Sequence, residues 1–496
     1  MLKRMLKLRS VSWLGLLFAL MPLYGQGYEI EISLKGLSND TVILGEYFTS
    51  RMIPKDTIVL DNKGRGVFEG TEKFKGGMYL IYIDQNHFFD FLIDKDQVFS
   101  IETDTSDFVS ATLFQGSEDN ALFHEYKTLL ASSREKASLY KKNLAEATNQ
   151  ADSAKAKSAL DQLDKSIESY YAKLKNDYPN HFVTIFIAAT RDPVAPESIL
   201  KGTKREIDSI RYMYYIEHYL DNFDVGDVRL LHSPLYENKI KTYISRVVPQ
   251  HPDSLVLAVD YLIEESRSDE EIFRYMLITL FNHFAESKFM GMDVIYFHIA
   301  EKYYIPEATW SDPVFLSKLE KTLAENKPTL IGQKAPNLVM RKVPFEHFQM
   351  AALDTAIRSD PHIGENFQIH DIQANYTILY FWEADCGHCK KSTPALYESY
   401  QRLKALGVEV IAVHAINSVE GKETWVDFVN QHEMYDWINC WSPYSNDFRI
   451  SYNLQSFPQL FILDASKKII ARKISPEQAE DIITKLHKLD QNNNTN

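Results

Sequence analysis

A strand that leads directly into a Cys-x-x-Cys helix start constrains this chain more than any other feature. Residues 377–382 read Thr-Ile-Leu-Tyr-Phe-Trp, a continuous apolar run typical of a central strand buried on both faces. Cys386-Gly-His-Cys389 follows after a short turn, and residues 392–406 have the pattern of a helix. In this strand–turn–helix setting, the paired cysteines indicate a redox pair.

The two cysteines of the pair are predicted to differ in ionisation. Free backbone N–H groups and the positive end of the helix dipole favour a thiolate at Cys386. Because the thiolate is the nucleophile in disulfide exchange, Cys386 is the predicted nucleophile. Cys389 lies one helical turn further on, and it is predicted to be buried, protonated and placed to attack a mixed disulfide formed on Cys386.

The chain around this motif alternates between strands and helices. This alternation predicts an α/β domain over residues 327–490, followed by a polar, disordered tail over 491–496. The predicted strands are 377–382, 408–414 and 459–464 with a hairpin partner at 467–471, and the predicted helices are 392–406, 422–433 and 477–489.

The first part of the chain has the pattern of short strands separated by turns. Residues 28–34 alternate apolar and polar side chains, as a half-buried strand does. Asn62-Lys-Gly and Asp94-Lys-Asp supply turn signals between further apolar runs. We predict a small antiparallel sandwich or barrel over residues 28–110.

Residues 111–326 are predicted to be all-helical. Apolar side chains between residues 160 and 174 recur at steps of three and four, which marks one face of an amphipathic helix. Residues 134–165 are rich in Ala, Lys, Glu and Asp, and they are interpreted as a solvated helical hairpin or short coiled coil. The predicted fold class is therefore multidomain: all-β, then all-α, then α/β.

The first 27 residues have the pattern of a secretory signal peptide. Basic residues precede an apolar run from 11 to 23 that is shorter than the roughly 20 residues of a membrane span. A signal peptide over residues 1–27 predicts a periplasmic protein, soluble or peripherally attached, and an uncleaved anchor is the alternative. The formal net charge of -14 argues against nucleic acid as a partner.

The chain contains three cysteines, the third being Cys440. An exported protein held together by disulfides would carry more, so hydrophobic cores must stabilise this one. A structural zinc site, the alternative for Cys386 and Cys389, needs four ligands, and no second Cys-x-x-Cys is present. We therefore predict no metal and no cofactor beyond a redox-active disulfide, Cys386–Cys389. Cys440 is interpreted as a buried thiol, with a third redox cysteine as the alternative.

Residues 381–394, Phe-Trp-Glu-Ala-Asp-Cys-Gly-His-Cys-Lys-Lys-Ser-Thr-Pro, resemble the active-site segment of thioredoxin-fold proteins. They are most similar to the TlpA/ResA branch of exported bacterial thiol–disulfide oxidoreductases, in which a proline kinks the helix as Pro394 would here. Residues 331–336, Ile-Gly-Gln-Lys-Ala-Pro, resemble the start of the same domain. The resemblance begins at about Pro328, and the preceding β-rich and helical parts look like the extensions found on some of these proteins.

The same resemblance extends to a substrate-binding loop. Phe457-Pro458 matches the family's cis-proline, which lies across from the active cysteines and helps to hold the substrate chain. On this basis, Trp382, Phe457 and Pro458 are the predicted substrate-binding residues.

Three positions near the cysteines depart from the family pattern. Asp385 stands where the family usually has Trp, and its carboxylate would disfavour a thiolate at the next residue. His388 resembles its counterpart in protein disulfide isomerases, where the imidazole stabilises the thiolate. Tyr380 stands where thioredoxin has a buried Asp that assists proton transfer to the second cysteine. Glu383 is the candidate substitute for that role, with a solvated carboxylate as the alternative.

The resemblance implies an enzyme that exchanges disulfides, with reduction favoured over oxidation or isomerisation. Its partners would be exported cysteine-containing proteins and a membrane or periplasmic thiol electron donor. The alternative is a redox-responsive binding protein in which the β-rich and helical parts hold a partner. A thiol peroxidase would need Thr at position 383, where this chain has Glu. His414, at the end of a predicted strand, is interpreted as packed rather than catalytic.

Overall fold

The computed structural model describes residues 27–354, 356–357, 364–416, 418–442 and 447–493. The chain divides into two compact units, one up to Val247 and one from Val248 onward. This division falls inside the region predicted to be one helical domain, and the predicted domain boundaries remain predictions. Apart from Gly27, the predicted signal peptide lies outside the described residues.

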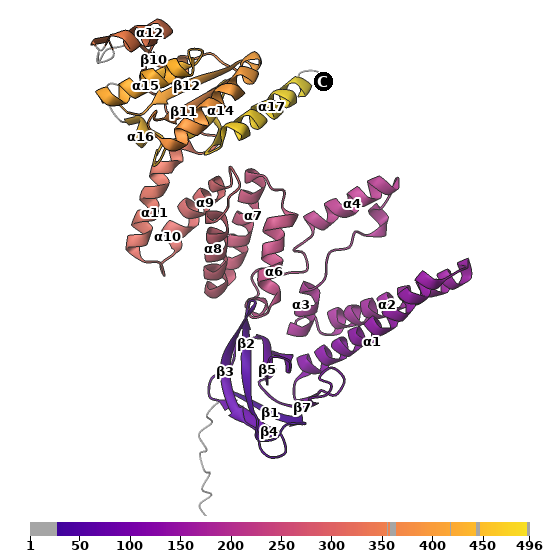
Figure 1. The fold of residues 1–496 in the computed structure, drawn as a ribbon. Coiled ribbons are helices and arrows are strands. Elements are labelled where there is room, and N and C mark those ends of the chain that lie inside the picture. The colour runs from indigo at the N-terminus through magenta and orange to yellow at the C-terminus, as the bar shows by residue number, and fades with distance from the viewer. Residues whose placement is uncertain (1–26, 355, 358–363, 417, 443–446, 494–496) are drawn as a thin grey trace, which may run out of the picture. The chain divides into compact units, whose positions relative to one another are not determined.

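Two four-stranded sheets form a β-sandwich at the start of the first unit (Figure 1). In β1 (Tyr28–Lys35), the alternation of the sequence places Ile30, Ile32 and Leu34 in the core and Glu31 at the surface. The sheet orders are β4-β1-β7-β8 and β3-β2-β5-β6, and β1 runs parallel to β7. The remaining strands are β2 (Thr41–Phe48), β3 (Arg51–Val59), β4 (Arg65–Gly70), β5 (Gly77–Tyr82), β6 (Phe88–Ile93), β7 (Val98–Asp104) and β8 (Leu113–Gln115).

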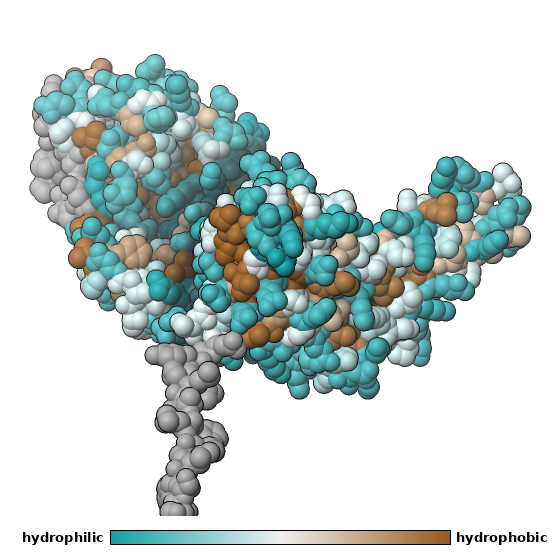
Figure 2. All heavy atoms as spheres, turned by 90° about the horizontal axis from the view of Figure 1, so that it is seen from below, coloured by the Kyte–Doolittle hydropathy of each residue, from teal (hydrophilic) through white to brown (hydrophobic). Residues whose placement is uncertain are grey.

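A long helical hairpin follows the sandwich in the first unit. It consists of α1 (Glu118–Glu146) and α2 (Gln150–Asp177), which lie side by side as predicted for this region (Figure 1). Its outer end is covered mainly by hydrophilic side chains (Figure 2). All residues of α2 are described, and of these only Ala156 and Leu174 are buried. Most of this helix is therefore solvated. The unit's other α-helices are α3 (Phe182–Ala189), α4 (Lys204–Glu217), α5 (Val228–Leu231) and α6 (Leu235–Thr242).

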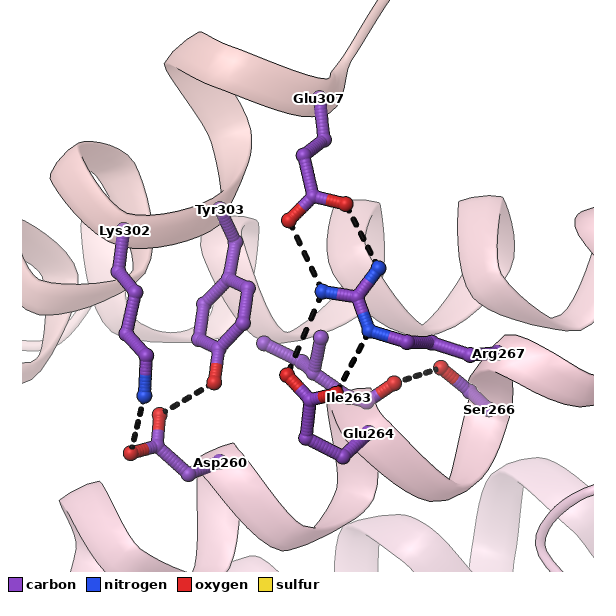
Figure 3. Close-up of polar contacts among 8 residues, drawn as sticks. All are labelled: Asp260, Ile263, Glu264, Ser266, Arg267, Lys302, Tyr303 and Glu307. Atoms are coloured by element: carbon purple, nitrogen blue, oxygen red, sulfur yellow. Dashed lines mark hydrogen bonds and ion pairs between the residues drawn. The ribbon is translucent and has the colours of Figure 1, made fainter.

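The second unit begins with helices that converge on one carboxylate. Asp260 accepts hydrogen bonds from His298 Nε2 at 2.6 Å, Lys302 Nζ at 2.8 Å and Tyr303 Oη at 2.8 Å; the last two are drawn in Figure 3. A π-helical turn over Ala300–Tyr304 widens the helix, which lets these three donors share one face. The helices are α7 (Pro252–Glu265), α8 (Glu270–Ala285), α9 (Asp293–Ile299), α10 (Ile305–Glu307) and α11 (Pro313–Asn326).

A seven-stranded sheet follows, in the order β10-β9-β13-β12-β11-β14-β15. Every residue of β11 (Tyr376–Trp382) is buried, and this strand pairs in parallel with β12 (Val408–His414) and antiparallel with β14 (Gln459–Asp464). The predicted all-β, all-α and α/β fold class is thus confirmed. The other strands are β9 (Val339–Lys342), β10 (Glu365–Gln368), β13 (Ile438–Trp441) and β15 (Ile469–Arg472).

Alternate side chains of β11 enter two separate cores. Tyr380 and Trp382 lie in the core that also contains residues of α12, α14, α15 and α17. Leu379 and Phe381 lie in the opposite core, with Phe448 of α16. Helices therefore cover both faces of the central strand, which explains its continuous apolar sequence. These helices are α12 (Phe345–Leu353), α14 (Gly387–Leu403), α15 (Val419–Gln431), α16 (Asp447–Ser451) and α17 (Pro476–Asn493).

Two arginines connect elements of the second unit. Arg267 bridges Glu264 of α7 and Glu307 of α10 (Figure 3). Arg472, at the end of β15, is buried and pairs with Asp293 at the start of α9. The Arg472 contact joins the sheet to the helices that precede it.

Several element boundaries differ from the sequence predictions, and two of these differences concern the cysteine motif and the tail. Helix α14 starts at Gly387, five residues before the predicted start at Ser392, and Cys386 occupies the N-cap position directly after the turn. Helix α17 continues to Asn493, so residues 491–493 are helical rather than part of a disordered tail, and the remaining tail residues lie outside the described ones. Among the described residues, no helix combines the length and the apolar character needed to cross a membrane.

Replacing Asp260 by Asn should lower the free energy of unfolding by about 1–2 kcal/mol, because three donors would lose a charged acceptor. Burial opposes ionisation of this carboxyl, but hydrogen bonds from Lys302, His298 and Tyr303 outweigh it and lower its pKa. This decrease in the free energy of unfolding should therefore have its full size at neutral pH. It should become smaller only as the pH falls below about 3.9, the usual Asp pKa. Urea unfolding across this pH range measures it. Glu265→Gln, an exposed site at the end of the same helix, is the control and should change little.

Candidate active site

The two cysteines of the motif lie at the start of α14 with different exposure. Cys386 is the residue that caps the helix, with φ -72° and ψ 125°, and it is half-buried. Cys389 is fully buried one turn further on. Cys386 therefore lies at the positive end of the helix dipole, and its partly exposed thiol can attack a substrate. Cys389 is shielded from solvent, so a substrate does not reach its sulfur directly.

The cis-proline loop lies directly against the exposed cysteine. The Phe457–Pro458 peptide bond is cis, as the family resemblance implied. The Cys386 thiol donates a hydrogen bond to the Phe457 carbonyl oxygen at 3.6 Å. Phe457 and Pro458 are both partly exposed, so a bound chain could contact them beside the sulfur.

Cys389 is held in its thiol form by its surroundings. Burial raises its pKa to about 12, and a hydrogen bond with Cys386 acts in the same direction. The neighbouring Tyr380 hydroxyl pairs with Thr393 Oγ1 at 2.9 Å, and burial raises the pKa of Tyr380 as well. Tyr380 therefore keeps its proton and cannot replace the carboxylate that thioredoxin has at this position.

Glu383 is half-buried and paired rather than simply solvated. Its Oε1 accepts a hydrogen bond from Arg449 Nη2 at 3.0 Å, and its backbone carbonyl accepts one from the Cys386 amide at 3.2 Å. Its charge also raises the pKa of Cys389, in addition to the larger effect of burial. The carboxylate is thus close enough to influence the buried thiol. Sequence reasoning missed Arg449, since no local pattern links α16 to the cysteine motif.

The polar residues around Cys386 are exposed. Asp385 lies at the surface, where its Oδ2 accepts a hydrogen bond from Thr424 Oγ1 of α15 at 3.3 Å. His388 is exposed on the first turn of α14. Both residues are therefore exposed close to Cys386 in the sequence.

Trp382 does not lie where a substrate contact requires it. Its side chain is 0% exposed and packs against Phe428 and His414, with ring centroids 5.2 and 5.7 Å away. The predicted substrate contact is therefore unavailable to this side chain, because the apolar packing that ends β11 encloses the indole. Trp382 supports the site from within the core instead.

His414 is packed, as interpreted from the sequence, and it also orders the active-site loop. Its Nε2 accepts a hydrogen bond from the Ala384 amide at 3.4 Å, and its Nδ1 bonds to the Ile416 carbonyl at 3.1 Å. Burial lowers its pKa to about 3, so the ring stays neutral. The register pair between His414 and Trp382 brings the imidazole under this loop, a contact that the linear sequence does not reveal.

Cys440 lies inside the sheet. It is 0% exposed in β13, and its thiol donates a hydrogen bond to the Ala412 carbonyl at 3.6 Å. Burial raises its pKa. The buried-thiol interpretation agrees with this position, and a third redox cysteine would need the sheet to open.

Comparison with known proteins supports the assignment of the C-terminal domain. A family model described as thioredoxin-like matches residues 374–469, and two models described as domains of unknown function, DUF4369 and DUF5106, match residues 28–123 and 140–325. Sporulation thiol-disulfide oxidoreductase A of Bacillus subtilis is 27% identical over 119 residues, which cover 24% of this chain and 70% of the relative. Thiol-disulfide oxidoreductase ResA of Bacillus cereus is 24% identical over 168 residues, covering 34% of this chain and 82% of the relative.

A solved structure adds a further likeness at the level of sequence. A domain of a possible thiol-disulfide isomerase from Cytophaga hutchinsonii is 33% identical, covers 34% of this chain and 99% of that domain, and has a TM-score of 0.27.

In the reduced chain near neutral pH, iodoacetamide should label Cys386 more than about a hundredfold faster than Cys389. Each pKa unit above the ambient pH lowers the thiolate fraction about tenfold, and burial further protects Cys389. Mass spectrometry of tryptic peptides measures the labelling. Cys440 serves as the internal control and should react only after denaturation. Comparable labelling of Cys386 and Cys389 in the folded chain would contradict the assigned asymmetry.

Proposed function

Because its C-terminal domain belongs to the thioredoxin-like family and its relatives are thiol–disulfide oxidoreductases, we propose that this enzyme exchanges disulfides through Cys386 and Cys389. The observation that carries the proposal is the asymmetry of the pair. A half-buried cysteine caps a helix and touches the cis-proline loop, and a fully buried cysteine follows one turn later.

Reduction of a substrate proceeds in two thiol–disulfide exchanges. The Cys386 thiolate attacks one sulfur of the substrate disulfide, and the substrate's other sulfur leaves as a thiolate. Cys389 then loses its proton and attacks the Cys386 sulfur, which releases the second substrate sulfur. The substrate gains two electrons and becomes a dithiol, while the enzyme becomes the Cys386–Cys389 disulfide. Oxidation of a substrate is the same path in reverse.

The second exchange needs a base, because the pKa of Cys389 is raised to about 12 by burial. We assign this role to Glu383, whose charge is felt at the buried thiol. A hydrogen bond from the Glu383 backbone favours the Cys389 thiolate and would assist the same step. His388 would stabilise the Cys386 thiolate from the exposed side of the first helical turn.

We assign substrate binding to Phe457, whose carbonyl oxygen accepts a hydrogen bond from the Cys386 thiol, and to the neighbouring Pro458. The substrates would be exported cysteine-containing proteins, and a membrane or periplasmic thiol donor would reduce the Cys386–Cys389 disulfide again. The signal-peptide pattern at the N-terminus supports export. We favour net reduction of substrates, in keeping with the TlpA/ResA resemblance.

Replacing Cys386 or Cys389 by serine should stop turnover, but at different steps. Cys386→Ser should reduce the rate of insulin disulfide reduction to background, because no nucleophile remains. Cys389→Ser should stop after the first exchange and accumulate a mixed disulfide on Cys386, visible on a non-reducing gel. Cys440→Ser, which removes a buried thiol outside the site, is the matched control and should keep turnover. Turnover by Cys386→Ser would refute the assigned nucleophile.

A further inference from the structure

One arginine outside the cysteine motif contacts three loops near that motif. Arg449, on α16, donates hydrogen bonds from Nη2 to Glu383 Oε1 at 3.0 Å and to the Ala415 carbonyl at 3.2 Å. Its guanidinium also lies over the Phe457 ring, 4.6 Å from the centroid. These contacts reach the loop after β11, the loop after β12 and the loop before β14.

The residues that Arg449 holds are the direct neighbours of the redox cysteine. The Glu383 carbonyl accepts the Cys386 amide, and the Phe457 carbonyl accepts the Cys386 thiol. Arg449 thus fixes both sides of the exposed cysteine without an observed contact to its sulfur. Its fork geometry suits this task, because one planar group can bind two oxygens and stack on a ring.

Arg449 also offsets the charge of Glu383, which acts on the buried cysteine. The Glu383 and Arg449 side chains are 23% and 36% exposed, so their ion pair is only partly screened by solvent. Without the guanidinium, the Glu383 carboxylate would oppose formation of a thiolate at the pair. A reduced state that contains a thiolate would lose stability relative to the disulfide, and the reduction potential would become more negative.

We infer that Arg449 is a positioning residue of the redox site, which clamps the Glu383 loop to the cis-proline loop and neutralises Glu383, and so sets the potential of the pair. This inference rests on the proposed function of Cys386 and Cys389. It adds a residue from a separate element, α16, to the site.

The test is a redox titration of the full chain against glutathione with four variants, Arg449→Gln, Arg449→Lys, Glu383→Gln and the double Glu383→Gln/Arg449→Gln. Arg449→Gln should shift the equilibrium constant with glutathione about two- to fivefold towards the disulfide, the range expected of a partly exposed ion pair. The double variant should return close to the wild-type equilibrium, because it removes both charges. Arg449→Lys keeps the charge and should leave the equilibrium near wild type.

Kinetics separate the clamp from the charge. Arg449→Lys should raise KM for a protein disulfide more than it lowers kcat, because it keeps Glu383 and the charge but does not restore the stacking on Phe457. Arg402→Gln is the matched control: it removes the ion pair between Arg402, on the last turn of α14, and Glu480 of α17, and it should change neither potential nor KM. Circular dichroism checks that each variant is folded.

The outcomes distinguish two failures. A wild-type chain without a reversible couple would overturn the proposed function itself. A normal wild-type couple that a folded Arg449→Gln leaves unchanged, in both potential and KM, would overturn only the role of Arg449. A double variant shifted as far as Arg449→Gln would refute the charge argument.

Discussion

The burial of β11 on both faces is the constraint on which the redox site depends. A strand packed between two cores cannot shift along its axis, because a slip of one residue would exchange the side chains that face each core. The end of β11 at Trp382 is therefore fixed, and so is the start of α14 at Gly387. The short turn between them delivers Cys386 to the helix N-terminus and leaves little freedom for its sulfur.

The same geometry makes two identical side chains chemically different. Cys386 caps the helix at the rim of the domain, where it meets the cis-proline loop. Cys389 faces the core beneath Tyr380 and Trp382, where burial holds its thiol protonated. The two cysteines are one helical turn apart, and because the helix starts at the surface, residues three positions apart lie at different depths. The attacking sulfur of Cys386 is therefore partly exposed, and the resolving sulfur of Cys389 is buried. The buried tryptophan and the neutral His414 are the support for this arrangement, not part of its chemistry.

The sequence alone was enough to predict those elements whose own residues show a clear strand, turn or helix pattern. The strands at 377–382, 408–414 and 459–464 were predictable because their sequences are mostly apolar, as those of buried central strands are. The cysteine pair was predictable because strand, turn and helix are consecutive. By contrast, β4 contains two glycines in six residues, which weakens its strand propensity, and it forms by pairing with β1. The short β13 likewise depends on its neighbours in the sheet.

Trp382 was wrongly predicted to contact substrate, because a position near a motif does not reveal which way the side chain points. Arg449 was missed because its contacts join segments far apart in the sequence, and only the folded sheet brings them together.

The most direct test of the central claim is the reduction potential of the Cys386–Cys389 pair, measured by equilibrating the full chain with glutathione buffers and quantifying free thiols. We expect one reversible two-electron couple, towards the reducing end of the range from about -270 mV for thioredoxin to about -180 mV for protein disulfide isomerase. A couple near the isomerase value would contradict net reduction. The absence of any reversible couple would contradict the redox function itself.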